Sequence, residues 1–226
     1  SKTFGEPLRN LYLRDIYLNF FVLKEGDNLK WYRDMLFPYL MKINIGKTSI
    51  MKYRKHLLKS VKGNILEIGI GMGTNLAVYP KEISNITAID PYVRELPQSG
   101  IFVTIIPENA ERMSFEDNTF DTVVSTFSLC SMDNLVAALT EINRVLKPGG
   151  RLLFLEHGKA TNKPGQTLQK IFNPLYNIFA YGCNITRDYA EELKCAGFNI
   201  VEYKIYKARV YPRTLVGYLY VGIAEK

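Results

Sequence analysis

The sequence predicts an α/β fold, in which short buried strands alternate with helices around a largely parallel sheet. Two observations lead to this prediction. Short apolar runs that end in glycine or polar residues recur from about residue 60 onward, as is typical of strands buried on both faces. Helical segments alternate with these runs, and the 226-residue chain has room for one sizeable core.

The first apolar run belongs to the segment NILEIGIGMGT at residues 64–74. Its apolar half suits a buried strand, and Gly69, Gly71 and Gly73 suit a tight turn that lets a ligand approach the backbone before a helix begins. Glu67 lies inside the apolar run, where a carboxylate is costly unless it is hydrogen-bonded. The segment therefore predicts a nucleotide-type binding loop.

Asp90 ends the next apolar run, at residues 86–90. A carboxylate at the tip of the neighbouring strand is placed to bind a ribose. The dinucleotide fingerprint G-x-G-x-x-G does not fit, because the third glycine comes one position early and Thr74 stands in its place. A glycine-rich turn in an unrelated α/β protein is the alternative interpretation.

The remaining elements follow in chain order. A helix with basic residues in its last turn is expected to end before Pro148 and two glycines. A second helix is expected over 186–196, with Thr186 as its cap and Asp188 in its first turn. Strands are expected over residues 101–106, 120–124, 151–156, 198–206 and 215–224.

The Glu-x-Gly-x-Gly-x-Gly form followed by Asp90 resembles the S-adenosylmethionine-dependent methyltransferases of the Rossmann-like superfamily. Residues 108–124 are similar to the adenine loop and fourth strand of that family, with Asn109 where many members have Asp. The resemblance extends from about residue 60 to the C-terminus. It implies a Rossmann-like methyltransferase fold: a seven-stranded, mostly parallel sheet with an antiparallel edge strand, preceded by N-terminal helices.

The resemblance also implies S-adenosylmethionine as cofactor and S-adenosylhomocysteine as product. Glu67 would fix the glycine-loop backbone and approach the methionine amino group, and Asp90 would take the ribose hydroxyls. Asn109 and Ala110 would flank adenine, and Thr126 would lie at the methionine end. The cofactor-binding residues are thus predicted to be Glu67, Gly69, Gly71, Gly73, Asp90, Asn109, Ala110 and Thr126.

Four further motifs narrow the resemblance to the animal thiol S-methyltransferases and their microbial relatives. These motifs are Ser128–Ser131, Glu156-His157, Phe172–Pro174 and Gly182–Arg187. The implied reaction is methyl transfer to a small-molecule acceptor, a thiol first of all. A phospholipid or small-amine N-methyltransferase at a membrane surface and a non-catalytic cofactor-binding protein are the alternatives.

His157 and Glu156 are the candidate catalytic residues. They follow the fifth strand, at the carboxyl edge of the sheet where ligands bind. The unperturbed pKa of histidine lies near neutrality, so His157 suits a base or an orienting group, although a hydrogen bond capping the strand is an equal alternative. Glu156 is expected to bind the histidine or a substrate amine. A thiol needs little help from a base, because its reference pKa is about 8.5.

The net charge and the cysteine spacing limit the kinds of partner and metal that the protein is expected to bind. The formal charge of +7 is compatible with binding to nucleic acid, with binding to a membrane surface, or with a charge that only keeps the protein soluble. No nucleic-acid module is recognisable, and the basic cluster at residues 52–62 is interpreted as the solvated face of a helix, so no nucleic-acid partner is predicted. Cys130, Cys183 and Cys195 have neither metal-site spacing nor a disulfide framework, which predicts no metal and a reducing compartment.

Two regions are expected: an N-terminal helical cap over residues 1–60 and a methyltransferase domain over 61–226. Aromatic and apolar residues at 11–23 and 31–41 either cover the sheet and cofactor or contact a membrane surface. No run reaches the roughly 18 apolar residues that span a bilayer. We therefore expect a cytoplasmic protein, with peripheral membrane contact left open. The sequence does not predict the oligomeric state.

Overall fold

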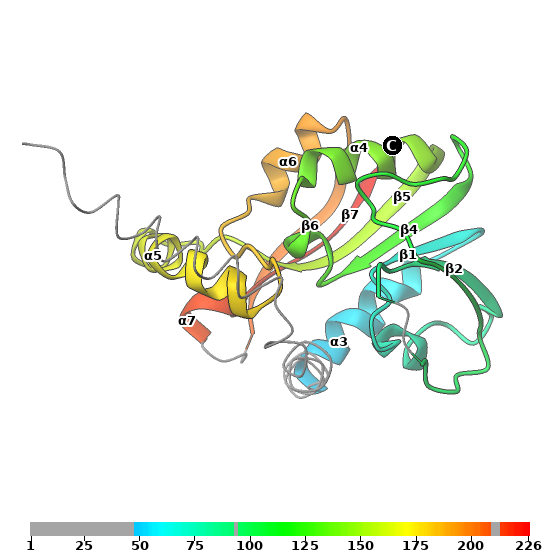
Figure 1. The fold of residues 1–226 in the computed structure, drawn as a ribbon, viewed down its shortest axis with the longest axis horizontal. Coiled ribbons are helices and arrows are strands. Elements are labelled where there is room, and N and C mark those ends of the chain that lie inside the picture. The colour runs from blue at the N-terminus through cyan, green and yellow to red at the C-terminus, as the bar shows by residue number, and fades with distance from the viewer. Residues whose placement is uncertain (1–47, 93–94, 209–212) are drawn as a thin grey trace, which may run out of the picture. The chain divides into compact units, whose positions relative to one another are not determined.

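The computed structural model describes residues 48–92, 95–208 and 213–226. The sheet has seven strands in the order β3-β2-β1-β4-β5-β7-β6 (Figure 1). The expected Rossmann-like methyltransferase fold is confirmed. The strands are β1 (Ile65–Ile68), β2 (Asn85–Ile89), β3 (Phe102–Ile106), β4 (Phe120–Thr126), β5 (Leu146–His157), β6 (Asn199–Lys207) and β7 (Tyr218–Glu225).

The five strands from β3 to β5 pair in parallel, and β7 runs antiparallel to both β5 and β6. The sheet grows outward from β1 in both directions, because β2 and β4 pair with opposite edges of β1. In open α/β sheets, ligands bind where the strand order reverses in this way. The carboxyl ends of β1, β2 and β4 are therefore the place to look for a site.

Helices cover the half of the sheet from β4 to β6. α4 and α6 lie on one side of the sheet, and α3 lies on the other (Figure 1). The core lies between these layers and includes the fully buried Leu139, Ile142 and Phe154. The described helices are α3 (Thr48–Leu57), α4 (Leu135–Val145), α5 (Lys163–Phe179), α6 (Tyr189–Cys195) and α7 (Arg213–Val216).

The segment after the glycine loop differs from the prediction. A short 3-10 helix, Thr74–Ala77, stands where a full helix was expected. Pro80 follows closely, and the residue before a proline disfavours helical geometry. The short helix also lets Asn75 and Tyr79 point into the protein, where both hydrogen-bond Glu67.

Helix α5 was not predicted. Asn162 caps it by accepting a hydrogen bond from the Gly165 N–H at 2.8 Å, with a proline in the first turn. Pro174 lies inside the helix. Because proline normally ends a helix, its presence argued against a helix in this segment. Its exposed apolar side chains are Ile171, Phe172, Leu175 and Phe179.

Two predicted boundaries are also wrong. α6 begins at Tyr189, and Thr186 does not cap it, since its hydroxyl donates to Asn184 Oδ1 at 2.7 Å. β7 begins at Tyr218 rather than at residue 215, because residues 213–216 form α7.

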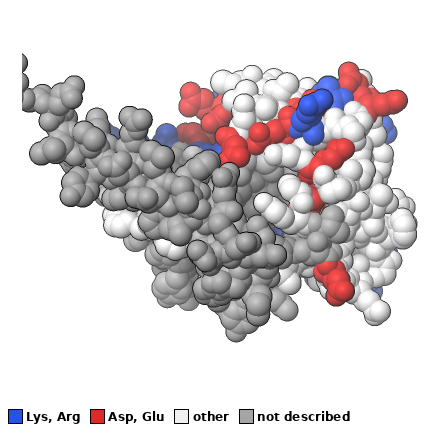
Figure 2. Space-filling model, viewed as in Figure 1, with Lys and Arg blue, Asp and Glu red and all other residues white. Residues whose placement is uncertain are grey.

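The cap predicted over residues 1–60 falls outside the described residues as far as residue 47, as do the aromatic segments at 11–23 and 31–41. None of the helices in the described part is long and apolar enough to cross a membrane. On the face shown in Figure 2, acidic and basic side chains lie next to one another along one rim. This mixture of signs differs from the basic stripe that binds phosphate backbones.

Candidate active site

The glycine loop after β1 requires its glycines. Gly69, Gly71 and Gly73 have φ values of 67°, 54° and 66°, in the left-handed region that glycine adopts without strain. A Cβ at Gly69 would lie 2.1 Å from Ser128 Oγ, whereas a Cβ at Gly71 would meet no described residue closer than the Gly69 carbonyl oxygen at 4.0 Å. The loop is therefore packed against protein at Gly69 and has free space beside Gly71.

Asp90 holds this loop from the end of β2. One carboxylate oxygen accepts from the Gly71 N–H at 2.8 Å, and the other accepts from the Tyr92 N–H at 2.8 Å. Each oxygen retains a lone pair, because a carboxylate offers about four acceptor positions. Asp90 can thus bind the loop and two hydroxyl groups at once.

Glu67 lies buried in β1 and binds the turn after the loop. Its carboxylate accepts from Asn75 Nδ2 at 2.9 Å and from the Tyr79 hydroxyl at 2.6 Å. Burial raises the pKa of Glu67 to about 7, although these hydrogen bonds and Arg54 oppose the rise. The expectation that Glu67 fixes the glycine-loop backbone is wrong: its partners are side chains, and the loop backbone is bound by Asp90.

Arg54 of α3 brings a buried positive charge to the same place. The side chain is 2% exposed, and Nη1 donates to Asn75 Oδ1 at 2.5 Å and to Thr126 Oγ1 at 2.6 Å. Burial lowers the pKa of Arg54 to about 10, which leaves it protonated at neutral pH. Nε is buried and has no hydrogen-bond partner in the described structure.

The interpretation of Arg54 as part of a solvated helix face is therefore wrong. A signal was present in the sequence, because Arg54 lies four residues after Ile50 and four before Leu58. Residues at this spacing share one face of a helix, and both neighbours are fully buried. The neighbouring basic residues at 52–62 suggested a solvated face and hid this periodicity.

The segment predicted to flank adenine follows β3. Ala110 is buried and Asn109 is exposed, with the Asn109 side-chain oxygen accepting from the Glu111 N–H at 3.0 Å. The Asn109 backbone carbonyl accepts from the Arg112 N–H at 3.1 Å. These local bonds give the segment a defined turn at the sheet edge.

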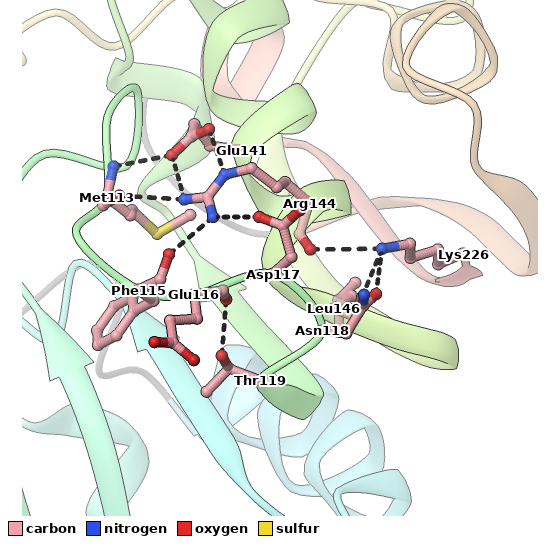
Figure 3. A network of polar contacts seen from close by, with 10 residues as sticks. All are labelled: Met113, Phe115, Glu116, Asp117, Asn118, Thr119, Glu141, Arg144, Leu146 and Lys226. Carbon is pink, nitrogen blue, oxygen red and sulfur yellow. Dashed lines mark hydrogen bonds and ion pairs between the residues drawn. The ribbon is translucent and has the colours of Figure 1, made fainter.

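Arg144 of α4 anchors the continuation of this segment. Its guanidinium donates to the Met113 and Phe115 carbonyl oxygens, to Asp117 and to both carboxylate oxygens of Glu141 (Figure 3). Glu141 in turn accepts from the Met113 N–H at 2.9 Å. One arginine thus connects the β3–β4 loop to a core helix.

Glu156, near the end of β5, is fully buried. Its carboxylate accepts four hydrogen bonds, at 2.8 to 3.1 Å, from the Ser125 hydroxyl and the backbone N–H groups of Ser128, Leu129 and Cys130. Oε1 accepts three of these bonds and Oε2 accepts one, all from groups at or just after the end of β4. This corrects the expectation that Glu156 binds His157 or a substrate amine: it positions the loop after β4.

His157 is the last residue of β5 and is 4% exposed. Its ring centroid lies 4.7 Å from that of Phe127, and its Nδ1 lies 3.6 Å from Cys183 Sγ. Its Nε2 is buried without a hydrogen-bond partner among the described residues. His157 therefore stands between the end of β4 and two buried cysteines.

The two cysteines beside His157 differ in acidity. Hydrogen bonds from Cys130 and then from His157 lower the pKa of Cys183 to about 6, against the effect of burial. The bond to Cys183 and burial raise the pKa of Cys130. Cys183 is therefore the more acidic of the two buried thiols.

Known proteins resemble this chain in both sequence and fold. Residues 66–154 match the family described as methyltransferase domain. The rat thiol S-methyltransferase TMT1B is 30% identical over 189 residues, which are 74% of this chain and 76% of the rat protein. The chain is a class I S-adenosylmethionine-dependent methyltransferase.

Two further proteins are similar to this methyltransferase. Human thiol S-methyltransferase TMT1A is 32% identical over 153 residues, 62% of each chain. A solved N-methyltransferase of Haemonchus contortus, in complex with phosphomonomethylethanolamine and S-adenosylhomocysteine, superimposes with a TM-score of 0.55 at 18% identity. That alignment covers 78% of this chain and 44% of the other, and it shows a shared fold.

The residues of this methyltransferase fit its cofactor. The free space beside Gly71, the unused lone pairs of Asp90 and the orphaned Nε of Arg54 lie at the ends or flanks of β1, β2 and β4. Thr126 already accepts from both Arg54 and Asn75. The predicted binding residues therefore lie along one edge of the sheet, and the structure places Arg54 next to Thr126 at this edge.

Proposed function

We propose that this methyltransferase transfers the methyl group of S-adenosylmethionine to the sulfur of a small thiol. The observation that carries the proposal is the state of Glu156, whose carboxylate is fully buried and accepts four internal hydrogen bonds, so that it is not placed to take a proton from a substrate. An amine or phenol acceptor needs a base to remove its proton in most cases. A thiol, with a pKa near 8.5, is partly ionised without one.

The similarity to rat TMT1B and human TMT1A, both named as thiol S-methyltransferases, supports the same acceptor. His157 suits this acceptor as well. Its buried Nε2 can accept the proton that a thiol loses, and its ring lies 4.7 Å from that of Phe127.

The cofactor supplies an electrophilic methyl group on a sulfonium. We propose that Gly71 lets its backbone approach, that Asp90 accepts from its ribose hydroxyls, and that Asn109 and Ala110 flank its adenine. Arg54 is placed to bind its carboxylate with Nε, while Glu67 and Thr126 keep the arginine in position. The protein's contribution is then mainly orientation of the two reactants, which can account for a large part of the rate.

A matched pair of acceptors tests the proposal. The purified protein is incubated with S-adenosylmethionine and either 2-mercaptoethanol or ethanolamine, which differ only in the acceptor atom, and with phosphatidylethanolamine vesicles. Mass spectrometry detects the methylated products, and Asp90→Ala provides the background. We expect S-methylation alone; methylation of the amine or the lipid without S-methylation would refute the thiol assignment.

A further inference from the structure

Three side chains that are distant in the sequence meet behind the candidate site. They are Cys130, in the turn after β4, His157, at the end of β5, and Cys183, in the loop after α5. One donor atom from each, Sγ, imidazole nitrogen and Sγ, lies within 4.8 Å of the other two. The three residues are 1%, 4% and 5% exposed.

The separation of these donors matches that of ligands on a single zinc ion. Zn–S bonds of about 2.3 Å and Zn–N bonds of about 2.0–2.1 Å place a sulfur and a nitrogen roughly 3.6 Å apart in tetrahedral geometry. The distance between Cys183 Sγ and His157 Nδ1 is 3.6 Å. The remaining donors need to move little to share one ion.

The backbone around the cluster is held in place on both sides of Cys130. The Cys130 N–H donates to Glu156 at 3.1 Å, and the Cys130 carbonyl accepts from the Asn184 N–H at 2.7 Å. The second bond joins the two cysteine segments directly. Fixed ligand segments of this kind reduce the cost of assembling a metal site.

We propose that Cys130, His157 and Cys183 bind a zinc ion through Sγ, Nδ1 and Sγ, with the two thiols releasing their protons on binding. Sequence spacing predicted no metal, since the three ligands come from separate motifs at residues 128–131, 156–157 and 182–187. The fold brings the motifs together and supplies a role for each. Two thiolates and an imidazole are a ligand set that zinc prefers.

Three protein ligands leave the fourth position of a tetrahedral zinc for an exogenous ligand. We assign this position to the acceptor sulfur, an extension that depends on the proposed thiol function. Zinc would then hold the acceptor as a thiolate, with its proton released to solvent, and His157 would act as a ligand rather than as a base. The ring of Phe127, 4.7 Å from that of His157, connects this position to the end of β4.

The chain offers few other metal ligands of this kind, which makes the test specific. It has three cysteines and two histidines in all, so Cys195 and His56 are the only ones outside the cluster. The untagged protein is purified under reducing conditions, and its zinc content and zinc affinity are measured. Cobalt substitution then reports thiolate ligation through charge-transfer absorption and tetrahedral geometry through the visible bands.

We expect one zinc per chain in the wild type and in Cys195→Ser and His56→Gln. Cys130→Ser and Cys183→Ser should bind zinc more than about 100-fold more weakly, since loss of an outer-shell partner alone costs 10–100-fold. The cobalt spectrum of the wild type tests the ligand set without any variant, so the test remains valid even if a serine variant fails to fold. Three results would overturn the site. They are a wild type without zinc, cluster variants that bind zinc as tightly as the wild type, and an intact mass that shows a Cys130–Cys183 disulfide.

Addition of 2-mercaptoethanol to the cobalt protein separates the two claims. A change in the visible bands supports acceptor binding at the metal. An unchanged spectrum in a protein that does bind metal and does methylate thiols refutes the open position and leaves the proposed function intact.

Discussion

The buried carboxyl group of Glu67 makes the stability of this protein depend on pH. Its pKa is raised from 4.5 to about 7 in the folded state, so the folded protein holds a proton that the unfolded chain has lost. The stabilising effect of that proton is fully present below about pH 4.5 and disappears as the pH rises through 7.

Replacement of Glu67 by glutamine should remove this dependence. Between pH 5 and pH 8 the free energy of unfolding of the wild type should fall by about 2–3 kcal/mol relative to that of Glu67→Gln, as the pKa difference requires. Urea denaturation without cofactor at several pH values measures both proteins. Parallel pH profiles would show that Glu67 does not titrate abnormally.

Alanine substitutions at two glycines of the loop distinguish a loss of stability from a loss of cofactor binding. Alanine at position 71 meets only the strain of a left-handed backbone, roughly 1–2 kcal/mol, because its Cβ lies in free space. Alanine at position 69 meets the same strain and also collides with Ser128. Gly71→Ala should therefore fold well and yet bind S-adenosylhomocysteine at least tenfold more weakly, whereas Gly69→Ala should lose stability as well.

Thermal melting and calorimetric titration of the two variants give the comparison. Wild-type affinity in Gly71→Ala would mean that the cofactor does not approach the backbone there.

At the scale of elements, Arg144 fixes the β3–β4 loop on α4. Arg144→Ala removes hydrogen bonds to two backbone carbonyls and two carboxylates, and should lower the free energy of unfolding by about 1–3 kcal/mol. Asp117→Ala is the matched control, since that side chain is 68% exposed and an exposed pair contributes about 0–1 kcal/mol.

Chemical denaturation of both variants tests this ranking. Hydrogen exchange at Ala110 should also accelerate in Arg144→Ala, because the loop carrying it loses its anchor. An Arg144 variant as stable as the Asp117 variant would contradict the role given to this network.

Sequence periodicity predicted the elements in which local pattern and tertiary environment agree. The strands from β1 to β6 follow from apolar runs; β1 and β4 are buried along almost their whole length, whereas β3 and β6 are partly exposed. Helix α5 was not predicted because Pro174 lies inside it. The short 3-10 helix after the glycine loop results from Pro80 and from Asn75 and Tyr79, whose polar side chains point into the protein. In both places long-range packing overrides the local rule.

For the whole molecule, the resemblance to a known family predicted a seven-stranded, mostly parallel sheet, and the positions of the glycine loop and Asp90 in the sequence predicted the edge at which the cofactor binds. The interior chemistry could not be predicted in this way. It consists of tertiary contacts between segments up to 72 residues apart: the hydrogen bonds of Arg54, those of Glu156, and the meeting of Cys130, His157 and Cys183. Helical spacing indicates that Arg54 is buried, but it does not identify the partners of any of these side chains.

Calorimetric titration tests the central claim most directly. The wild type and Asp90→Ala are each titrated with S-adenosylhomocysteine, S-adenosylmethionine and NADH. We predict that the two adenosyl ligands bind the wild type, that NADH does not, and that Asp90→Ala binds the adenosyl ligands at least tenfold more weakly through the loss of charge-assisted hydrogen bonds. Equal affinity in Asp90→Ala, or binding of NADH in place of the adenosyl ligands, would contradict the site described for this protein.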